Sequence, residues 1–257
     1  MNIKAALVLA YDELSPYSDS KRWEFFNNLK HLEFFTANMP RGASVLDIGS
    51  GIGIFALALS KLGYRVVGMD KYIFQPDNYL SIEKNGVDGL QKIWQKNNLS
   101  IINNDIFSFS FDKKFDCVVN IAVLEHQKSP KKFIELCLRH LKPNGYFFCV
   151  VPNMVDLLNR LRFLFGRSAC RDLKPFFEAG EDFVGHWREY TIKEMMQMAD
   201  WSGLEIIKAK NYRTSPLFNR KDKFPRNIWL AFFRLLSDLV PGARETNTIL
   251  ARYNIKN

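Results

Sequence analysis

Residues 45–53 (VLDIGSGIG) constrain the fold of this chain more than any other segment. They join an apolar, β-branched stretch to an acidic residue and three alternating glycines. The apolar stretch predicts a buried parallel strand at 44–48, and residues 54–61 (IFALALSK) predict the helix that follows. Glycine lacks a Cβ and adopts positive φ, so this turn lets the backbone approach a ligand at the helix N-terminus. The three glycines are Gly49, Gly51 and Gly53. A nucleotide-type cofactor site is therefore predicted.

A second acidic residue fits the same kind of site. Residues 65–69 predict a second strand that ends at Asp70. A carboxylate about 20 residues beyond a glycine turn commonly accepts hydrogen bonds from ribose hydroxyls. Read from Gly51, the turn also fits the dinucleotide fingerprint GxGxxA, with Ala56 in the last position. An NAD-dependent oxidoreductase is therefore one of the alternatives.

Asp47 favours another cofactor. It lies two residues ahead of Gly49, and the whole segment resembles motif I of the class I S-adenosylmethionine-dependent methyltransferases, where this position is acidic. The resemblance covers roughly residues 41–257. It places the later strands at 101–104, at 115–120, after a Pro-Asn-Gly turn within 138–152, within 191–211 and at 248–253.

The resemblance implies an α/β fold. We expect a Rossmann-like seven-stranded mixed sheet, mostly parallel with the last strand antiparallel, and helices on both faces. Residues 1–40 are expected to form an N-terminal helical cap, with a helix at 19–37. Residues 41–257 are expected to form the methyltransferase domain. Its insertions fall at about 153–190, the lid or acceptor region, and at 213–245, a basic apolar helix.

The resemblance also implies the cofactor and its ligands. S-adenosylmethionine is the expected cofactor, and Asp105 is expected to contact the adenine amine. The residues assigned to cofactor binding are Asp47, Gly49, Gly51, Gly53, Asp70, Asp105, Ile106 and Asn120. Because the sulfonium is already a strong electrophile, the enzyme's main task is to orient the acceptor. A base is needed only where the acceptor is a hydroxyl, and histidine is suited to that role.

One predicted histidine base follows the fourth strand. Residues 123–126 (VLEH) resemble the corresponding segment of ubiquinone-pathway methyltransferases. His126 is interpreted as a catalytic base or, with Glu125, as a metal ligand or a brace for the next helix; Glu125 is also assigned to acceptor binding. Ala122 stands where the resemblance would place a further carboxylate. A hard cation needs several oxygen ligands, so no metal is predicted.

The second histidine lies in residues 184–191 (VGHWREYT). This segment resembles one in methyltransferases encoded among polysaccharide-biosynthesis genes. The resemblance implies that His186 and Tyr190 act on an acceptor hydroxyl and that Arg188 binds an anionic group. The alternative is a loop held on the sheet by its aromatic residues. The predicted activity is O-methylation of a small or lipid-linked acceptor such as a saccharide. A quinone-like lipid aromatic is the alternative acceptor, and a non-catalytic cofactor-binding partner is the non-enzyme alternative.

Charge suggests where a partner binds. The chain holds 36 Lys and Arg against 27 Asp and Glu, a net charge of +9. Basic residues gather at 159–171 and at 213–234, where Arg220, Lys221 and Lys223 lead into the apolar stretch 228–240. We hypothesise that these segments contact an anionic membrane surface; packing on the sheet or in a dimer is the alternative. The oligomeric state is left open.

Nucleic acid is not a predicted partner. Base-amine methyltransferases of this fold usually carry an Asn or Asp followed by two prolines after the fourth strand, whereas Asn120 is followed by Ile121 and Ala122. The four cysteines form no CxxC pair, which favours reduced thiols and a cytoplasmic location. The basic apolar segments would add peripheral association at the inner membrane surface. The apolar residues 5–10 are too few for a signal segment. No apolar run approaches the roughly 20 residues of a spanning helix.

Overall fold

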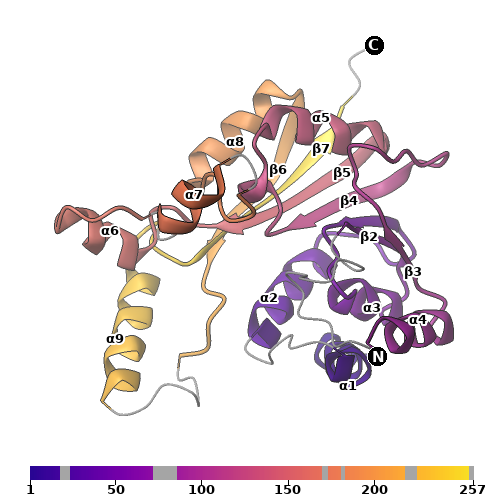
Figure 1. Cartoon of the computed structure of the whole chain (residues 1–257), viewed down its shortest axis with the longest axis horizontal. Helices are drawn as coiled ribbons and strands as arrows, with labels where there is room; N and C mark the ends of the chain where they lie inside the picture. The colour runs from indigo at the N-terminus through magenta and orange to yellow at the C-terminus, as the bar shows by residue number, and fades with distance from the viewer. Residues whose placement is uncertain (18–23, 72–85, 170–172, 181–182, 218–224, 255–257) are drawn as a thin grey trace. The chain divides into compact units, whose positions relative to one another are not determined.

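The computed structural model describes residues 1–17, 24–71, 86–169, 173–180, 183–217 and 225–254. Seven strands in these ranges hydrogen-bond in the order β3-β2-β1-β4-β5-β7-β6 (Figure 1). The sheet is mostly parallel, its last strands are antiparallel, and helices flank it. The predicted Rossmann-like α/β fold is confirmed.

The strands are β1 Ser44–Ile48, β2 Arg65–Asp70, β3 Ser100–Asn103, β4 Phe115–Ile121, β5 Leu141–Pro152, β6 Leu204–Tyr212 and β7 Thr246–Tyr253. The α-helices are α1 Ile3–Leu14, α2 Phe25–Thr36, α3 Ile54–Lys61, α4 Gly86–Lys96, α5 Pro130–Arg139, α6 Leu157–Leu164, α7 Leu173–Ala179, α8 Ile192–Trp201 and α9 Arg226–Leu239. Short 3₁₀ helices among the described residues are η1 Ser15–Tyr17 and η3 Leu124–His126. None of the described helices is both long enough and apolar enough to cross a membrane.

Contacts divide the chain into two compact units. Unit 1 comprises Met1–Ile121, Leu136–Phe148 and Tyr253–Asn257. Unit 2 comprises Ala122–Glu135 and Cys149–Arg252. Each unit carries part of the predicted site, so the two are described separately.

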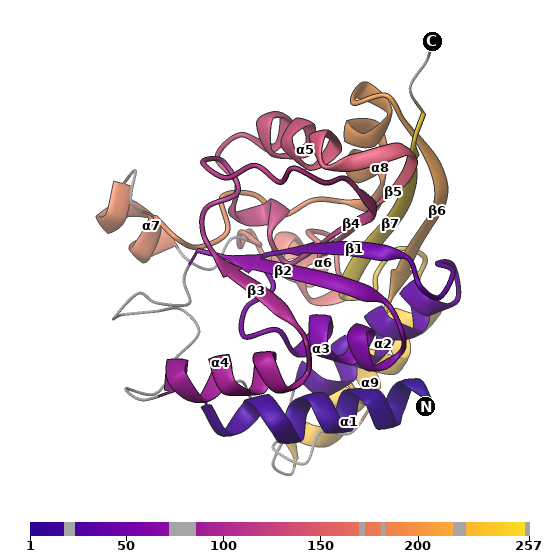
Figure 2. The ribbon, with the colours of Figure 1, turned by 90° about the vertical axis from the view of Figure 1, so that its right-hand side faces the viewer.

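Unit 1 is built on β1, which lies between β2 and β4 and is parallel to both. The chain reverses its direction of winding at β1 and β4. Sheets of this kind bind ligands beyond the carboxyl ends of the strands at such a point. Figure 2 shows α1 to α4 on one face of β1 to β3. Residues 54–59 of α3 are all buried, which explains why this helix is apolar on every side.

Two features of unit 1 differ from expectation. The first is α1, a separate helix within the expected helical cap, in which only the helix at 19–37 had been placed: it packs on α2 and α3 and buries an apolar stripe, Ala6, Leu7, Ala10 and Leu14. α2 confirms the later part of the helix predicted at 19–37, whose residues 19–23 lie outside the described ranges. The second is the expected Pro-Asn-Gly turn, which falls inside β5. Asn144 has φ 60° there, a value that asparagine tolerates better than most residues.

Unit 2 is organised around two buried asparagines. Asn153 Nδ2 donates to the carbonyls of Gly242, at 2.8 Å, and Arg244, at 2.7 Å. Asn247 Nδ2 donates to Asn153 Oδ1 and to the carbonyl of Tyr190, both at 3.0 Å. These bonds tie the end of β5, the start of β7 and the segment before α8 together. Buried cysteines outside any disulfide among the described residues are Cys117 and Cys137 in unit 1 and Cys149 in unit 2; Cys170 lies outside the described ranges.

Candidate active site

The glycine turn of unit 1 adopts the conformation that only glycine takes readily. Gly49, Gly51 and Gly53 have φ values of 74°, 55° and 88°. Gly53 is also the N-cap of α3. A Cβ at Gly53 would lie 3.1 Å from Ile101 Cδ1, so the position is constrained by space as well as by backbone conformation. The turn therefore brings backbone N–H groups to the start of α3, where an anionic or polar ligand is favoured.

Asp70 holds this turn in place. Its Oδ2 accepts a hydrogen bond from the Gly51 N–H at 3.0 Å. The Gly49 N–H donates to the Met69 carbonyl at 2.7 Å. Met69 lies beside Ile48 in the β1–β2 register, so both contacts come from the carboxyl end of β2. Asp70 thus has a role in shaping the turn in addition to any contact with a ligand.

Two buried acceptors lie on the neighbouring strands β1 and β4. Asp47 Oδ2 and Asn120 Oδ1 are buried and have no hydrogen-bond partner within the described residues. Asn120 Nδ2 donates to the Phe148 carbonyl at 3.2 Å, which fixes the orientation of the amide. Burial raises the pKa of Asp47 to about 7, and the nearby charge of Asp70 adds to the effect. Unpartnered buried acceptors are costly, so each of these two side chains suits a ligand or water that brings a donor.

The other two predicted cofactor residues follow β3. Asp105 Oδ1 accepts from the Phe107 N–H at 3.0 Å, and its Oδ2 lies 3.3 Å from Lys71 Nζ. Ile106 is buried. All eight predicted cofactor residues therefore belong to unit 1 and cluster around the carboxyl ends of β1 to β4.

In unit 2, Glu125 is fully buried, with 0% of its surface exposed. Neither carboxylate oxygen has a hydrogen-bond partner within the described part of the chain. Burial raises the pKa of this carboxyl to about 7. Its backbone carbonyl accepts from the N–H groups of Trp187, at 2.8 Å, and Arg188, at 3.3 Å. The VLEH and GHWREY segments are therefore joined through Glu125.

The two predicted histidines meet edge to face. Their ring centroids lie 4.8 Å apart at 84°. His126 Nδ1 lies 2.9 Å from the carbonyl oxygen of Val184 and 3.1 Å from that of Gly185. Carbonyl oxygens only accept, so Nδ1 carries the proton and Nε2 carries the lone pair in the neutral ring.

His186 has the same tautomer for a different reason. Its Nδ1 lies 3.0 Å from Glu189 Oε1, and a carboxylate partner again places the proton on Nδ1. The sequence reasoning missed Glu189. A glutamate three residues after a histidine is unremarkable in a loop, and only the fold of the loop turns the two side chains toward each other.

The remaining predicted acceptor residues, Arg188 and Tyr190, already have partners within the protein. Arg188 donates to Glu194 Oε1 at 2.6 Å, and Glu194 belongs to the capping box that starts α8 with Thr191. Tyr190 is buried, its backbone is fixed by Asn247, and burial raises the pKa of its phenol. The structure thus groups His126, His186 and Glu125 closely, with Arg188 and Tyr190 beside them at the entry to α8.

Aromatic side chains hold the loop that carries His186. Phe176, Phe183 and Trp187 make three edge-to-face contacts, with ring centroids 5.3 to 5.7 Å apart. Trp187 Nε1 also donates to the Phe183 carbonyl at 3.2 Å. These contacts fix the loop against α7, and both the structural and the functional interpretation of this segment stay predictions.

The group formed by Glu125, His126 and His186 has the composition of a cation site. The ligand atoms of Glu125, His126 and His186 lie within 4.8 Å of one another. One carboxylate and two imidazoles suit a metal such as Zn²⁺. The absence of a metal stays a prediction.

Comparisons with known proteins agree with these sites. A family model described as a methyltransferase domain matches residues 21–209. The mitochondrial ubiquinone biosynthesis O-methyltransferase of Dictyostelium discoideum is 26% identical over 68% of this chain and 54% of that protein, so the chain spans about half the length of this relative. The ubiquinone biosynthesis O-methyltransferase of Coxiella burnetii is 25% identical over 83% of this chain and 86% of that one.

Solved structures show the same fold. The 1,6-didemethyltoxoflavin N1-methyltransferase of Burkholderia thailandensis, solved with S-adenosylhomocysteine, aligns with a TM-score of 0.59 at 16% identity. The alignment covers 98% of this chain and 90% of that one. These matches decide between the alternatives in favour of S-adenosylmethionine over NAD and of an enzyme over a binding partner. The chain belongs to the methyltransferase-domain family and is a class I S-adenosylmethionine-dependent methyltransferase.

Proposed function

We propose that the enzyme methylates a hydroxyl group of a small or lipid-linked acceptor, such as a saccharide. The observation that carries this proposal is the His186–Glu189 pair beside His126. A methyl acceptor that is a hydroxyl must lose its proton, and this cluster offers two imidazoles whose Nε2 atoms are the basic ones.

In this proposal the residues of unit 1 hold the cofactor. Asp70 accepts from ribose hydroxyls, Asp105 from the adenine amine, and the buried acceptors Asp47 and Asn120 take donors from the amino acid moiety. When bound, S-adenosylmethionine supplies an electrophilic methyl group and leaves as the neutral thioether S-adenosylhomocysteine.

The residues of unit 2 act on the acceptor. His186 Nε2 takes the proton from the acceptor hydroxyl while the hydroxyl oxygen forms the new bond to the methyl carbon. Glu189 keeps the ring oriented and balances the imidazolium charge. Arg188 and Tyr190 contact the rest of the acceptor. Only residues 121–124 separate Asn120 of the cofactor cluster from Glu125 along the chain, which supports a shared reaction.

A quinone-like lipid aromatic is the second candidate acceptor. The names of the relatives from Dictyostelium discoideum and Coxiella burnetii favour it. A phenol also needs less help to lose its proton than a sugar hydroxyl does, so His186 would matter less for it.

The test is transfer of radiolabelled methyl from S-adenosylmethionine into an extract of the source organism, partitioned into organic, small polar and macromolecular fractions. Label in polar or lipid-linked sugar supports the saccharide, and label in an aromatic lipid supports the quinone-like acceptor. Calorimetric binding of S-adenosylhomocysteine checks that the protein is folded. Label carried on a nitrogen or carbon atom contradicts O-methylation, and label in nucleic acid or protein contradicts a small or lipid-linked acceptor.

A further inference from the structure

Helix α9 of unit 2 is packed with its small side chains inward. Its buried positions are Ala231 and Ser237. Five of its large apolar side chains are exposed, up to 62% for Trp229 and 80% for Leu239, while Leu230, Phe233 and Leu236 are half-buried. The five exposed apolar residues are Ile228, Trp229, Phe232, Leu235 and Leu239. Steps of four, three and four residues from Ile228 place most of them in one stripe along the helix. A helix that served only the core would point this stripe inward.

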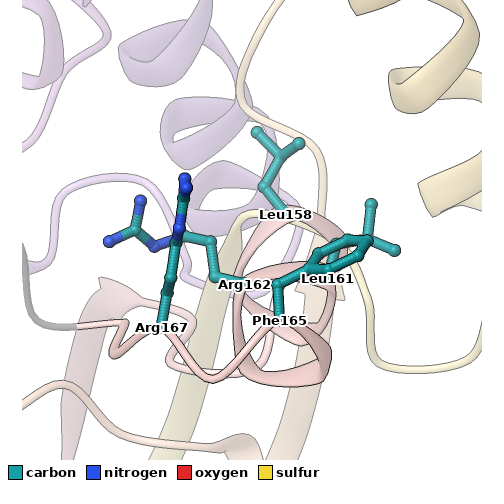
Figure 3. A pocket seen from close by; sticks show the side chains of 5 residues that line it. All are labelled: Leu158, Leu161, Arg162, Phe165 and Arg167. Carbon is teal, nitrogen blue, oxygen red and sulfur yellow. The ribbon is translucent and has the colours of Figure 1, made fainter.

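The end of α6 shows the same kind of exposure. Leu164 and Phe165 are each 79% exposed. An open hollow at this end is lined by Leu158, Leu161, Arg162, Phe165 and Arg167. Figure 3 shows the two guanidinium groups together on one side of the hollow, away from the ring of Phe165. Apolar and cationic groups therefore lie next to each other at the surface.

α6 and α9 are neighbours within unit 2. They contact each other directly, and Arg160 NH2 of α6 donates at 3.1 Å to the carbonyl of Pro241, which follows α9. Residues 156–167 and 226–239 hold five arginines and two aspartates. Both aspartates are occupied: Asp156 caps α6, and Asp238 pairs with Arg213 and Arg244. The surface formed by the two helices is therefore apolar and cationic.

We propose that the outward sides of α6 and α9, here called the α6–α9 face, bind the surface of an anionic lipid bilayer. Apolar side chains enter the boundary between headgroups and acyl chains, and the arginines contact anionic headgroups. A second copy of the chain fits less well, because it would bring like charges together. The two helices lie in the plane of the membrane rather than across it. The inference is independent of which acceptor is methylated.

The test is co-sedimentation of the full chain with vesicles of phosphatidylcholine, with and without phosphatidylglycerol. We expect binding at low salt only to vesicles that contain phosphatidylglycerol, and release at high salt. The variant Trp229→Ser/Phe232→Ser should bind at least about tenfold more weakly, because two apolar anchors are lost. The variant Arg162→Gln/Arg167→Gln should lose about fivefold for each arginine.

Trp201→Ser is the matched control, since Trp201 of α8 is 76% exposed outside the α6–α9 face. It should bind vesicles like the wild type. Failure of the wild type to bind at low salt overturns the proposal, as does equal loss of binding in the control. Analytical ultracentrifugation adds a further check: a dimer that dissociates in the Trp229→Ser/Phe232→Ser variant would assign the face to a second copy. A large shift in Tm of that variant would show that another segment of this chain covers the α6–α9 face.

Discussion

Nδ1 of His186 lies 3.0 Å from Oε1 of Glu189, three residues along the chain. This contact selects which nitrogen of the ring is basic. If His186 is the base, His186→Ala should lower kcat about 100-fold with little change in the KM for S-adenosylmethionine. Steady-state kinetics with the identified acceptor measure both quantities.

Glu189 is a positioning residue in this scheme. Glu189→Gln should lower kcat about tenfold, and Glu189→Asp should restore part of the loss, because a carboxylate is again present. Glu178→Gln serves as the control, since Glu178 is an exposed glutamate of α7 in the same unit. A fall in stability without a fall in kcat would contradict the positioning role.

The glycine turn offers a matched pair of variants. Gly53 and Gly63 both have positive φ, 88° and 92°, so alanine at either should destabilise the fold by about 1 to 2 kcal/mol. A Cβ at Gly63 meets nothing within 4 Å, whereas one at Gly53 meets Ile101. Gly53→Ala alone should weaken S-adenosylhomocysteine binding in calorimetry, by about tenfold or more. Equal binding by both variants would remove the turn from the cofactor site.

The raised pKa of the Glu125 carboxyl predicts a pH dependence of stability. Its folded pKa of about 7 lies above the ordinary value of 4.5, so ionisation favours the unfolded state. The contribution of this group to the free energy of unfolding should therefore fall as pH rises from about 4.5 to about 7, by up to about 3 kcal/mol. Urea unfolding of the wild type and of Glu125→Gln should show this fall as the difference between the two proteins.

Asp47 contributes in the same sense, since its pKa is also raised to about 7, so the Glu125→Gln slope should not vanish. Glu205→Gln is the control, because Glu205 is exposed on β6. His31 acts in the opposite sense, because burial lowers its pKa to about 3, so only the difference between wild type and Glu125→Gln reports on Glu125. A difference that stays constant over this pH range would show that the pKa of Glu125 is not raised in the folded protein.

Chelation tests the prediction that no metal is used. Methyl transfer should be unchanged after dialysis against EDTA. Loss of activity that Zn²⁺ or Mn²⁺ restores, and that Glu125→Gln abolishes, would instead assign Glu125, His126 and His186 to a cation.

A substitution at Arg188 tests whether this residue binds the acceptor. Arg188→Ala should raise the KM for an anionic acceptor about tenfold and leave S-adenosylhomocysteine affinity unchanged. Lys193→Ala removes a nearby exposed positive charge on α8 and is the control. No change in KM would confine Arg188 to its ion pair with Glu194, which the structure already shows.

The sequence by itself determined the fold class and a nucleotide-type cofactor site, and its resemblance to motif I implied S-adenosylmethionine. Residues 44–61 carry strand, turn and helix signals that are local, so β1, Gly53 and α3 were predicted at their observed bounds. Asp70 followed from its spacing beyond the glycine turn, since parallel strands bring their carboxyl ends to one edge, and Asp47 followed from the resemblance to motif I.

Only the tertiary structure decided how the second cluster is arranged. The Glu125 carbonyl bonds to the segment that begins about sixty residues later, and this contact brings His126 to His186. Pairing between distant segments leaves no periodic signal in a single sequence. The same holds for α9, where Ile228, Phe232, Leu235 and Leu239 look like a core stripe but are exposed, while the fold buries Ala231 and Ser237. Local patterns fix elements, while burial and side-chain partners depend on what the rest of the chain packs against them.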